Sequence, residues 1–431
     1  LSALTLTKSG TAFNGMITLG SFGAFFDILF CSAGVLSLLA ARPYMQREGL
    51  EQDEFHSLMM FAVSGMMLIA HAANLLTLFI GIEVMSVCFY VLAGYTRDSV
   101  RSIEAALKYF LLGSFATGFL IYGMALIYGA TGSMSYNLIF AASSQPLHFP
   151  ALMMIGIGLL IIGLSFKAAA FPFHQWAPDV YQGAPTVVTA FMSTAGKVAA
   201  FSALMPIIAI VSPAGGMKIQ MVLALLSATT MLVGNISALA QTNIKRMLAY
   251  SSIAQAGFML VGVVATSKAG LDGTLIYLLA YGIATIGAFA IVTLVRDSTG
   301  EATHLSQWAG LGKRSPLVAS AFALFLLAFA GIPLTSGFTG KFAVFTAGIA
   351  GGATPIVVLG VVASAVAAFF YVRVIVLMFF NEPAAEGGPS VVVPSSFTTL
   401  AIAVTVALTL FIGILPQTVL NLVEQAGLFV R

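Results

Sequence analysis

Ionisable side chains inside long apolar runs are the residues of this sequence that could do chemistry. Six of them lie in such runs, and they are Glu83, Lys108, Lys167, Lys197, Lys341 and Arg373. A Lys, Arg or Asp at the centre of a membrane span costs about 2.5–3.5 kcal/mol on the insertion scale. Such side chains must therefore face one another, backbone carbonyls or internal water, and the pattern indicates a route for protons or other ions.

Lysine is well suited to carry a proton through such a route. Burial lowers the pKa of a lysine from about 10.4 by several units, and a neighbouring carboxylate raises it again. A carboxylate that moves toward or away from a lysine therefore loads or unloads it. Arginine cannot do this, because it stays protonated. Glu83 is the buried carboxylate, and we expect one of the lysines to be its partner.

Each of the deepest residues also has a purely structural interpretation. Lys167 comes five residues before Pro172, so it could pair with a backbone carbonyl that the proline frees. Lys197 is the twelfth residue of its run, about 18 Å along a helix, which is too deep for easy contact with the surface. Lys341 could instead extend toward the surface from the end of its span, and Glu83 could belong to an inert ion pair.

Three further residues are more ambiguous. Lys108 follows Arg101 by seven residues and can reach the membrane surface, so a buried and a surface role stay open. Arg373 comes eight residues before Asn381, and extension to the surface is the better account of it. His174 could relay protons near neutral pH, or it could be a packing residue with a hydrogen bond.

The composition places these residues in a membrane protein. Apolar residues make up 59% of the chain and charged residues 8%, against about 25% charged residues in soluble domains. The net charge of +3 gives no argument for nucleic acid. Cys31 and Cys88 lie in apolar runs and predict neither a disulfide nor a metal site. Since the chain has no Walker loop, dinucleotide fingerprint or CxxC pair, we expect no cofactor, ATP or metal site on it.

A spanning helix needs about 20 mostly apolar residues, and the chain offers enough for twelve. Two of the runs are too long for one straight helix, and Pro172 interrupts the first, whereas Pro333 and Gly337 interrupt the second. We therefore expect an all-α polytopic membrane protein, one membrane domain over residues 1–431. The predicted spans are 22–41, 55–73, 74–94, 103–128, 150–176, 186–211, 218–240, 246–266, 271–295, 316–350, 355–380 and 397–424.

Basic residues gather in the loops on one side of this arrangement. Nine lie there, namely Arg42, Arg47, Arg97, Arg101, Lys245, Arg246, Arg296, Lys313 and Arg314. Four lie on the other side, namely Lys8, Lys218, Lys268 and Arg431. By the positive-inside rule the first side is cytoplasmic, and both ends of this chain lie on the opposite side. Because the chain begins at Leu1, we expect its natural N-terminus to lie further upstream.

The two interrupted spans occupy corresponding places in two groups of five. Residues 55–211 form the first group and 218–380 the second, and the interrupted span is the fourth in each. An odd number of spans gives the second group the opposite orientation. Interrupted helices in corresponding halves point to an inverted-repeat transporter core. We therefore predict two half-channels, followed by a final transmembrane helix over 397–424.

Four stretches carry a resemblance to a known family. The longest is Ser165–Thr186, SFKAAAFPFHQWAPDVYQGAPT, and the others are Ser102–Phe110, Gln241–Ile253 and Gly331–Phe342. Together they resemble the antiporter-like membrane subunits of respiratory complex I, above all the group known as subunit N. The resemblance covers essentially the whole chain. It implies a fourteen-helix fold with two inverted five-helix repeats, of which the first two helices would precede Leu1. The lack of a long lateral helix favours the N or M group over the L group, and Lys108 with the stretch Val180–Gly183 favours N over M.

The resemblance also implies roles for single residues. Glu83 matches the family's carboxylate on its fifth helix, and Lys167 matches the lysine of the broken seventh helix that pairs with it. Lys197 matches the central lysine of the eighth helix, and Lys341 the lysine of the broken twelfth. Lys108 matches a family lysine of less certain role, and His174 falls in the broken-helix segment.

The expected function is proton translocation as a subunit of an NADH:quinone oxidoreductase in a bacterial inner membrane. FMN, iron–sulfur clusters and quinone are expected in partner subunits and none on this chain. The expected partners are neighbouring antiporter-like and small membrane subunits and the lipid bilayer, with no nucleic acid. Two alternatives stay open. One is a subunit of a multi-subunit cation/proton antiporter, and the other is a structural membrane subunit with inert charges.

Overall fold

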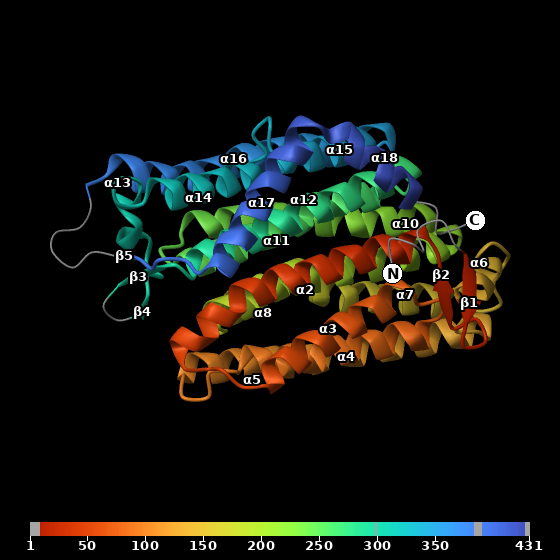
Figure 1. Cartoon of the computed structure of the whole chain (residues 1–431). Helices are drawn as coiled ribbons and strands as arrows, with labels where there is room; N and C mark the ends of the chain where they lie inside the picture. The colour runs from red at the N-terminus through yellow and green to blue at the C-terminus, as the bar shows by residue number, and fades with distance from the viewer. Residues whose placement is uncertain (1–8, 298–299, 383–389, 427–431) are drawn as a thin grey trace.

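The computed structural model describes residues 9–297, 300–382 and 390–426 as a bundle of long helices lying side by side (Figure 1). The helices of the first half are α2 (Ser21–Glu48), α3 (Glu54–Ala70), α4 (Leu75–Ala93), α5 (Val100–Thr131), α6 (Tyr136–Ser143), α7 (Pro150–Ala168), α8 (Trp176–Gly183), α9 (Thr186–Phe191) and the π-helical η1 (Met192–Gly196). Those of the second half are α10 (Lys197–Leu239), α11 (Ile244–Val264), α12 (Lys268–Val292), the 3₁₀ turn η2 (Leu305–Trp308), α13 (Leu311–Arg314), α14 (Pro316–Ala330), α15 (Ser336–Ala350), α16 (Thr354–Phe380), α17 (Ser396–Ile414) and α18 (Pro416–Ala426).

These helices cover all twelve predicted spans. Nine helical segments of the described residues are long and apolar enough to cross a membrane. One of the nine, Thr186–Leu239, contains two predicted spans, because α10 is interrupted at Gly216 (φ 46°, ψ −128°). Two shorter apolar helices, Glu54–Ala70 and Pro316–Ala330, supply the remaining predicted spans. The expectation of a polytopic helical membrane protein is therefore confirmed.

The structure corrects the prediction for the last span. Residues 397–424 are not one helix, because α17 ends at Ile414 and α18 begins at Pro416. Proline has no N–H to continue the hydrogen-bond ladder of the preceding helix, so a new helix starts there. Leu415, between the two helices, has non-helical dihedral angles (φ −122°, ψ 59°).

The fold is also not purely helical. A hairpin joins β1 (Gly10–Ala12) to β2 (Ile17–Leu19), and it lies at one end of the bundle in Figure 1. A small sheet at the opposite end pairs β3 (Val295–Asp297) with both β4 (Gly300–Glu301) and β5 (Ser390–Val391). The sheet with β3 marks the end that also holds the basic loops, which we call the basic end. Strands of two or three residues lie below the length that a hydrophobic pattern can indicate.

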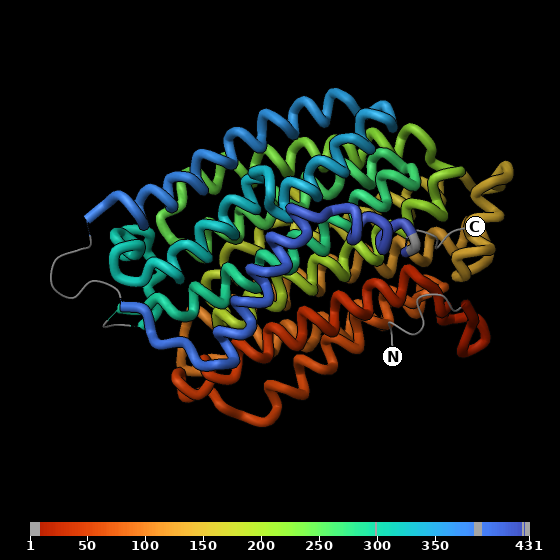
Figure 2. Tube along the Cα trace, turned by 45° about the horizontal axis from the view of Figure 1, so that its top comes forward, coloured from red at the N-terminus to blue at the C-terminus, as the bar shows by residue number. Residues whose placement is uncertain are grey.

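Two central helices hold the bundle together. In their most apolar stretches, 94% of the residues of α11 and α12 are buried, against 33% for α5 and α16. Figures 1 and 2 show α3, α4 and α5 along one side and α14 and α16 along the other, with α11 and α12 between them. The outward faces of α5 and α16 carry exposed apolar side chains such as Phe115 and Phe369. Such faces suit contact with lipid or with another membrane subunit.

Glycines bring helix backbones into direct contact at matching places in the two predicted repeats. In the first repeat, α3 meets α4 at Gly65 and Gly81, and α5 meets α7 at Gly123 and Gly156. In the second, α10 meets α11 at Gly234 and Gly257, and α12 meets α15 at Gly273 and Gly340. In both groups the first span packs on the second and the third packs on the broken fourth. The pairs of spans correspond, but α7 precedes its break whereas α15 follows its own. Small residues at helix crossings permit such close contacts.

We expect Gly234→Ala to destabilise the protein although alanine favours helices. A Cβ atom at Gly234 would lie 2.5 Å from the backbone nitrogen of Ala254, so α10 and α11 must separate. Overpacking of this kind costs about 1–3 kcal/mol. The measurement is the thermal unfolding midpoint of the purified membrane protein.

Gly118→Ala on α5 is the matched control, because nothing lies within 4 Å of a Cβ atom there. It should leave the midpoint unchanged or raise it, since alanine favours helix over glycine by about 1 kcal/mol. Equal midpoints for both variants would show that the α10–α11 contact tolerates a side chain.

Candidate functional site

Both predicted helix breaks are present. Helix α7 ends at Ala168, Ala169 adopts a left-handed conformation (φ 57°), and α8 begins only at Trp176, so Pro172 lies in the break. Helix α14 ends at Ala330, Gly331 is left-handed (φ 84°), and α15 begins at Ser336. Pro333 therefore lies inside the second break. Irregular backbone at this depth is tolerated only where protein or a water-filled cavity surrounds it.

Gly337 has a different role from the one predicted. It lies within the first turn of α15, not in the break. A Cβ atom there would lie 1.8 Å from the carbonyl oxygen of Ala328 on α14. The glycine therefore lets the two halves of the broken helix approach, and the break itself depends on Gly331 and the residues after it.

Lys167 lies buried in the last turn of α7 and points at α4. Its Nζ donates to Ser86 Oγ at 2.7 Å and lies 3.5 Å from the hydroxyl of Tyr90. Ser86 in turn donates to the carbonyl of Ile82 at 2.5 Å. The ammonium is thus solvated by hydroxyl groups, which replace the water that a lysine has in solution.

Glu83 and Lys167 do not form the expected ion pair, although the structure describes both residues. Glu83 is half-buried, and its carboxylate accepts a hydrogen bond from Thr117 of α5 at 2.8 Å. Ser86 lies three residues after Glu83 and hence on the same side of α4. The carboxylate of Glu83 therefore bonds to one hydroxyl group and the ammonium of Lys167 to another.

Lys197 is 3% exposed and lies where the π-helical turn η1 passes into α10. Its Nζ donates to the backbone carbonyl of Ser252 on α11 and to Ser252 Oγ, the latter at 2.7 Å. The hydroxyl of Tyr281 on α12 donates to the same Ser252 Oγ at 2.7 Å. π-helical turns occur frequently at functional sites. The lysine therefore joins the first repeat to the two central helices.

Lys341 does not extend to the surface, since it is 5% exposed. Its Nζ donates to the carbonyls of Phe329 and Ala330, both at 3.0 Å, and lies 4.5 Å above the ring of Phe258. Those carbonyls are the last of α14, and the break leaves them without helical partners. The sequence suggested such an arrangement for Lys167, whereas the structure has it at Lys341.

Neutral polar groups extend from Lys341 toward Lys197, and a sequence analysis based on charged residues does not indicate them. Gln255 Nε2 donates to the carbonyl of Phe329 at 3.0 Å, which also accepts from Lys341. The same amide lies 3.3 Å from the hydroxyl of Tyr371, which bonds to Ser251, the neighbour of Ser252. Ser251 and Ser252 lie one helical turn before Gln255 in an apolar run, and this spacing is the signal that could have revealed them.

Two small cavities lie near these polar groups, and Lys197 lines one of them. One of about 10 Å³ is lined by Lys167 and Lys197 together with Tyr109 and Tyr181 among others. A second of about 10 Å³ is lined by Tyr281, Gln255, Tyr277 and Phe329 among others. A cavity needs roughly 10–15 Å³ to hold one water molecule, and a buried water needs polar partners. Each cavity meets this requirement approximately and lies in the gap between two polar groups.

Lys108 is 43% exposed at its side chain and belongs to a surface cluster at the basic end. It pairs with Glu104 at 2.6 Å and with Asp179 of α8 at 2.7 Å. Asp179 also pairs with Arg246 of α11 at 2.5 Å. The buried interpretation of Lys108 is therefore wrong. Burial raises the pKa of the Asp179 carboxyl, but the hydrogen bonds from Lys108 and Arg246 outweigh it and hold the pKa below its usual range.

His174 lies in the α7–α8 connection, beside the rings of Phe171 and Tyr250 at centroid distances of 5.4 and 6.5 Å. Its Nδ1 is buried and makes no hydrogen bond with any described residue. Aromatic packing is therefore present. The relay role is not excluded by it, and that role stays a prediction. Arg373 is exposed and donates to the carbonyl of Leu239, as expected for a residue near the surface.

The chain is similar to known membrane subunits over nearly its whole length. Residues 72–367 match the family described as "NADH:quinone oxidoreductase/Mrp antiporter, TM". "NADH-quinone oxidoreductase subunit N 3" of Streptomyces griseus is 52% identical over 96% of this chain and 76% of that protein. "NADH-quinone oxidoreductase subunit N" of Rhodococcus opacus is 52% identical over 99% of this chain and 78% of its own length. A chain of respiratory complex I from Thermus thermophilus superposes with a TM-score of 0.82 at 36% identity, covering 97% of this chain and 90% of that one.

We expect Asp179→Asn to weaken the contact between α5, α8 and α11. The change leaves the cations of Lys108 and Arg246 without the carboxylate between them. Exposed ion pairs are worth about 0.2–1 kcal/mol each, so the unfolding midpoint should fall slightly at pH 7. Asp98→Asn, an exposed acid at the same end, should leave the midpoint unchanged.

The effect of Asp179→Asn should depend on pH in a defined direction. A carboxyl with a lowered pKa in the folded state stabilises the fold above its unfolded pKa of about 3.9, and this stability is lost as the pH falls through the folded value. The difference between the wild type and the variant should therefore shrink as the pH falls below about 4. A constant difference from pH 7 to pH 3 would contradict the assignment.

Proposed function

Because the chain belongs to the NADH:quinone oxidoreductase/Mrp antiporter membrane family, we propose that it is the antiporter-like subunit N of a proton-translocating NADH:quinone oxidoreductase. The observation that carries the proposal is the row of buried lysines 167, 197 and 341. Hydroxyls, carbonyls and two cavities fill the gaps in this row. Ionisable groups inside membrane helices usually mark ion or proton routes.

The first step of the proposed mechanism takes place between α4, α5 and α7. A push from a neighbouring subunit moves the Glu83 carboxylate from Thr117 toward Lys167. The negative charge then favours the protonated lysine, and its return to Thr117 favours release. Ser86 supports this step because its hydroxyl touches Lys167 and lies one helical turn from Glu83. No covalent chemistry is required of the chain.

The next steps carry the proton from one predicted half-channel to the other. A water in the first cavity takes the proton from Lys167 to Lys197. The Ser252 and Tyr281 hydroxyls and a water in the second cavity then connect Lys197 to the Gln255 region and Lys341. His174 supplies a side branch toward the basic end, where Lys108 lies at the surface beside Asp179.

The energy for this transport comes from outside the chain. Opposing potential costs about 2.3 kcal/mol per charge per 100 mV. In the proposal, quinone reduction in partner subunits provides it, with FMN and iron–sulfur clusters located there and no redox centre on this chain. The protein spans the bacterial inner membrane many times, and its basic end faces the cytoplasm. Residues 55–211 and 218–380 act as two inverted repeats, which the matching glycine contacts support.

The same family also includes subunits of Mrp-type antiporters, so cation/proton exchange is the second candidate. Sodium flux into vesicles without NADH oxidation would favour that candidate. A structural subunit with inert charges is the third, and it predicts normal pumping after loss of the central lysine.

The deciding experiment removes the central lysine. Lys197→Ala should abolish most NADH-driven proton uptake by inverted membrane vesicles, because the change removes the protonatable group between Lys167 and Lys341. Lys218→Ala is the control, since Lys218 is exposed and makes no contact with the row. Complex assembly and electron transfer to quinone are followed in the same vesicles.

Each result of this experiment has a distinct meaning. Lost pumping in an assembled complex supports the proposed route. Unchanged pumping and electron transfer in Lys197→Ala would make the lysine structural here and would favour the inert-subunit alternative.

Gln255→Leu tests the neutral part of the route. The change removes the amide between Phe329, Tyr277 and Tyr371 at nearly constant volume, so water and proton passage to Lys341 should slow several-fold. Gln220→Leu is the control, because that amide bonds to Thr266 at the opposite end from the basic loops. The measurement is the ratio of protons taken up to NADH oxidised. An unchanged ratio in Gln255→Leu would remove Gln255 from the route.

A further inference from the structure

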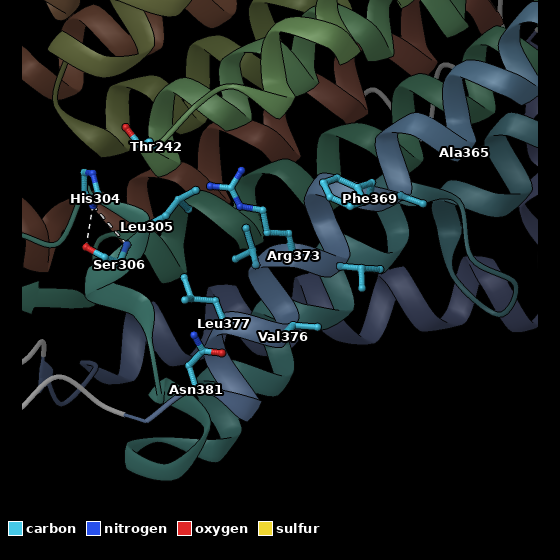
Figure 3. A pocket seen from close by; sticks show the side chains of 13 residues that line it. Thr242, His304, Leu305, Ser306, Ala365, Phe369, Arg373, Val376, Leu377 and Asn381 are labelled. Carbon is cyan, nitrogen blue, oxygen red and sulfur yellow. Dashed lines mark hydrogen bonds between the residues drawn. The ribbon is translucent and has the colours of Figure 1, made fainter.

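A groove of about 760 Å³ runs along the outer face of α16 at the basic end, away from the lysine row. Figure 3 shows the side chains that line it. They come from α16, from the turn η2 and from the loop before α11. The residues are Thr242, His304, Leu305, Ser306, Ala365, Ala368, Phe369, Val372, Arg373, Val374, Val376, Leu377 and Asn381. The proposed proton route uses none of them.

The groove has a polar end and an apolar end. Thr242, His304, Ser306 and Asn381 stand at the end nearest the basic loops, and all four are exposed. Toward the middle of the membrane the lining is apolar, and Phe369 and Val372 are 65% and 43% exposed. A ligand that matches both ends must be an amphiphile with its polar part toward the basic end.

Arg373 supplies a positive charge between these two ends. Among the described residues, its guanidinium makes one hydrogen bond, from Nη1 to the carbonyl of Leu239 at 3.1 Å. A guanidinium has five N–H donors, so most of them remain for a ligand, and it forms no ion pair with residues 9–297, 300–382 or 390–426. In Figure 3 it points away from the ribbon of α16, between Leu305 and Phe369. Planar donors of this kind suit a phosphate.

His304 adds a second donor at the polar end. Its Nδ1 accepts a hydrogen bond from the backbone N–H of Ser306, so in the neutral ring the hydrogen is on Nε2. The dashed lines in Figure 3 mark its contacts with Ser306. Nε2 makes no hydrogen bond with a described residue and is available to an anionic or carbonyl oxygen.

Arg373 lies about two turns from the basic end of α16, where a long arginine side chain can reach the lipid headgroups. Helix α16 has 27 residues and is therefore about 40 Å long, against about 30 Å for the hydrocarbon core. Its end extends beyond the hydrocarbon. Arg373 lies eight residues before Asn381, or about 12 Å, and Ala365 lies a further 12 Å deeper by the same rise per residue. A phosphate at Arg373 would thus place an acyl chain beside Phe369 and Ala365.

We propose that this groove binds one anionic phospholipid. Its phosphate sits on Arg373, its headgroup lies among Thr242, His304 and Ser306, and one acyl chain follows α16 to Ala365. Basic pockets at the cytoplasmic ends of membrane helices bind anionic lipid headgroups in this way. A transmembrane helix of another subunit would leave the guanidinium and the exposed polar end without an anion, so the lining favours a lipid.

The test is photolabelling of the whole complex in vesicles that contain phosphatidylglycerol with a diazirine in one acyl chain. Mass spectrometry of the peptide over 354–380 measures the label. We expect strong labelling near Phe369, and a several-fold loss in Arg373→Gln and in Ala365→Trp, which fills the exposed apolar end. A phosphatidylcholine probe should label weakly and independently of Arg373.

Arg97→Gln is the control, because Arg97 is a basic-end arginine outside the groove and 74% exposed at its side chain. It should leave labelling unchanged. Equal labelling by both lipids in all variants would mean ordinary annular lipid and would overturn the proposal. No label at α16, together with a cross-link from Ala365→Cys to another subunit, would overturn it in favour of a protein partner. Labelling and proton pumping are separate measurements, so a negative labelling result would not contradict the proposed function.

Discussion

Much of this architecture depends on one constraint, which is that a polar group inside hydrocarbon must find a partner within the protein. The second broken helix shows how the constraint is met. The break frees the carbonyls of Phe329 and Ala330, and the ammonium of Lys341 takes both. Without the lysine, the break would leave two buried carbonyls without donors. Without the break, the buried lysine would lack these two acceptors. A charge and a backbone defect therefore stabilise each other at the centre of the bundle.

The central helices extend the same solution through the protein. Helix α11 supplies Ser251, Ser252 and Gln255 on one side, and each bonds to a group from a different helix. Because α11 and α12 are almost completely buried, their polar side chains have only the protein and small cavities for partners. Fully bonded polar groups of this kind fix the packing of neighbouring helices. The structure that holds the bundle together is therefore also the structure that contacts the lysines.

The sequence was sufficient to predict features that depend on hydropathy and on rare residues. The twelve spans, both breaks and the buried positions of Lys167, Lys197 and Lys341 follow from apolar runs, prolines and charges inside them. The partners of those charges did not follow. Thr117 for Glu83 and Ser86 for Lys167 depend on how helices rotate about their axes, which the span pattern leaves undetermined. The surface position of Lys108 depends on Asp179, a residue that only tertiary packing brings near it. Pro416 indicates the division of the last span, but the apolar run continues past it, so hydropathy alone predicted one helix.

The small size of the two cavities near the lysine row has a consequence for proton leakage. Each has space for about one water molecule, so neither of these two cavities holds a continuous file of water. Passive leakage of protons down their gradient would need such a file. In the proposed route, each of these two cavities is therefore a point where protons stop unless water enters, and wetting of either cavity must coincide with the driving event. The same short stretch of protein then blocks protons when its cavities are dry and conducts them when its cavities hold water.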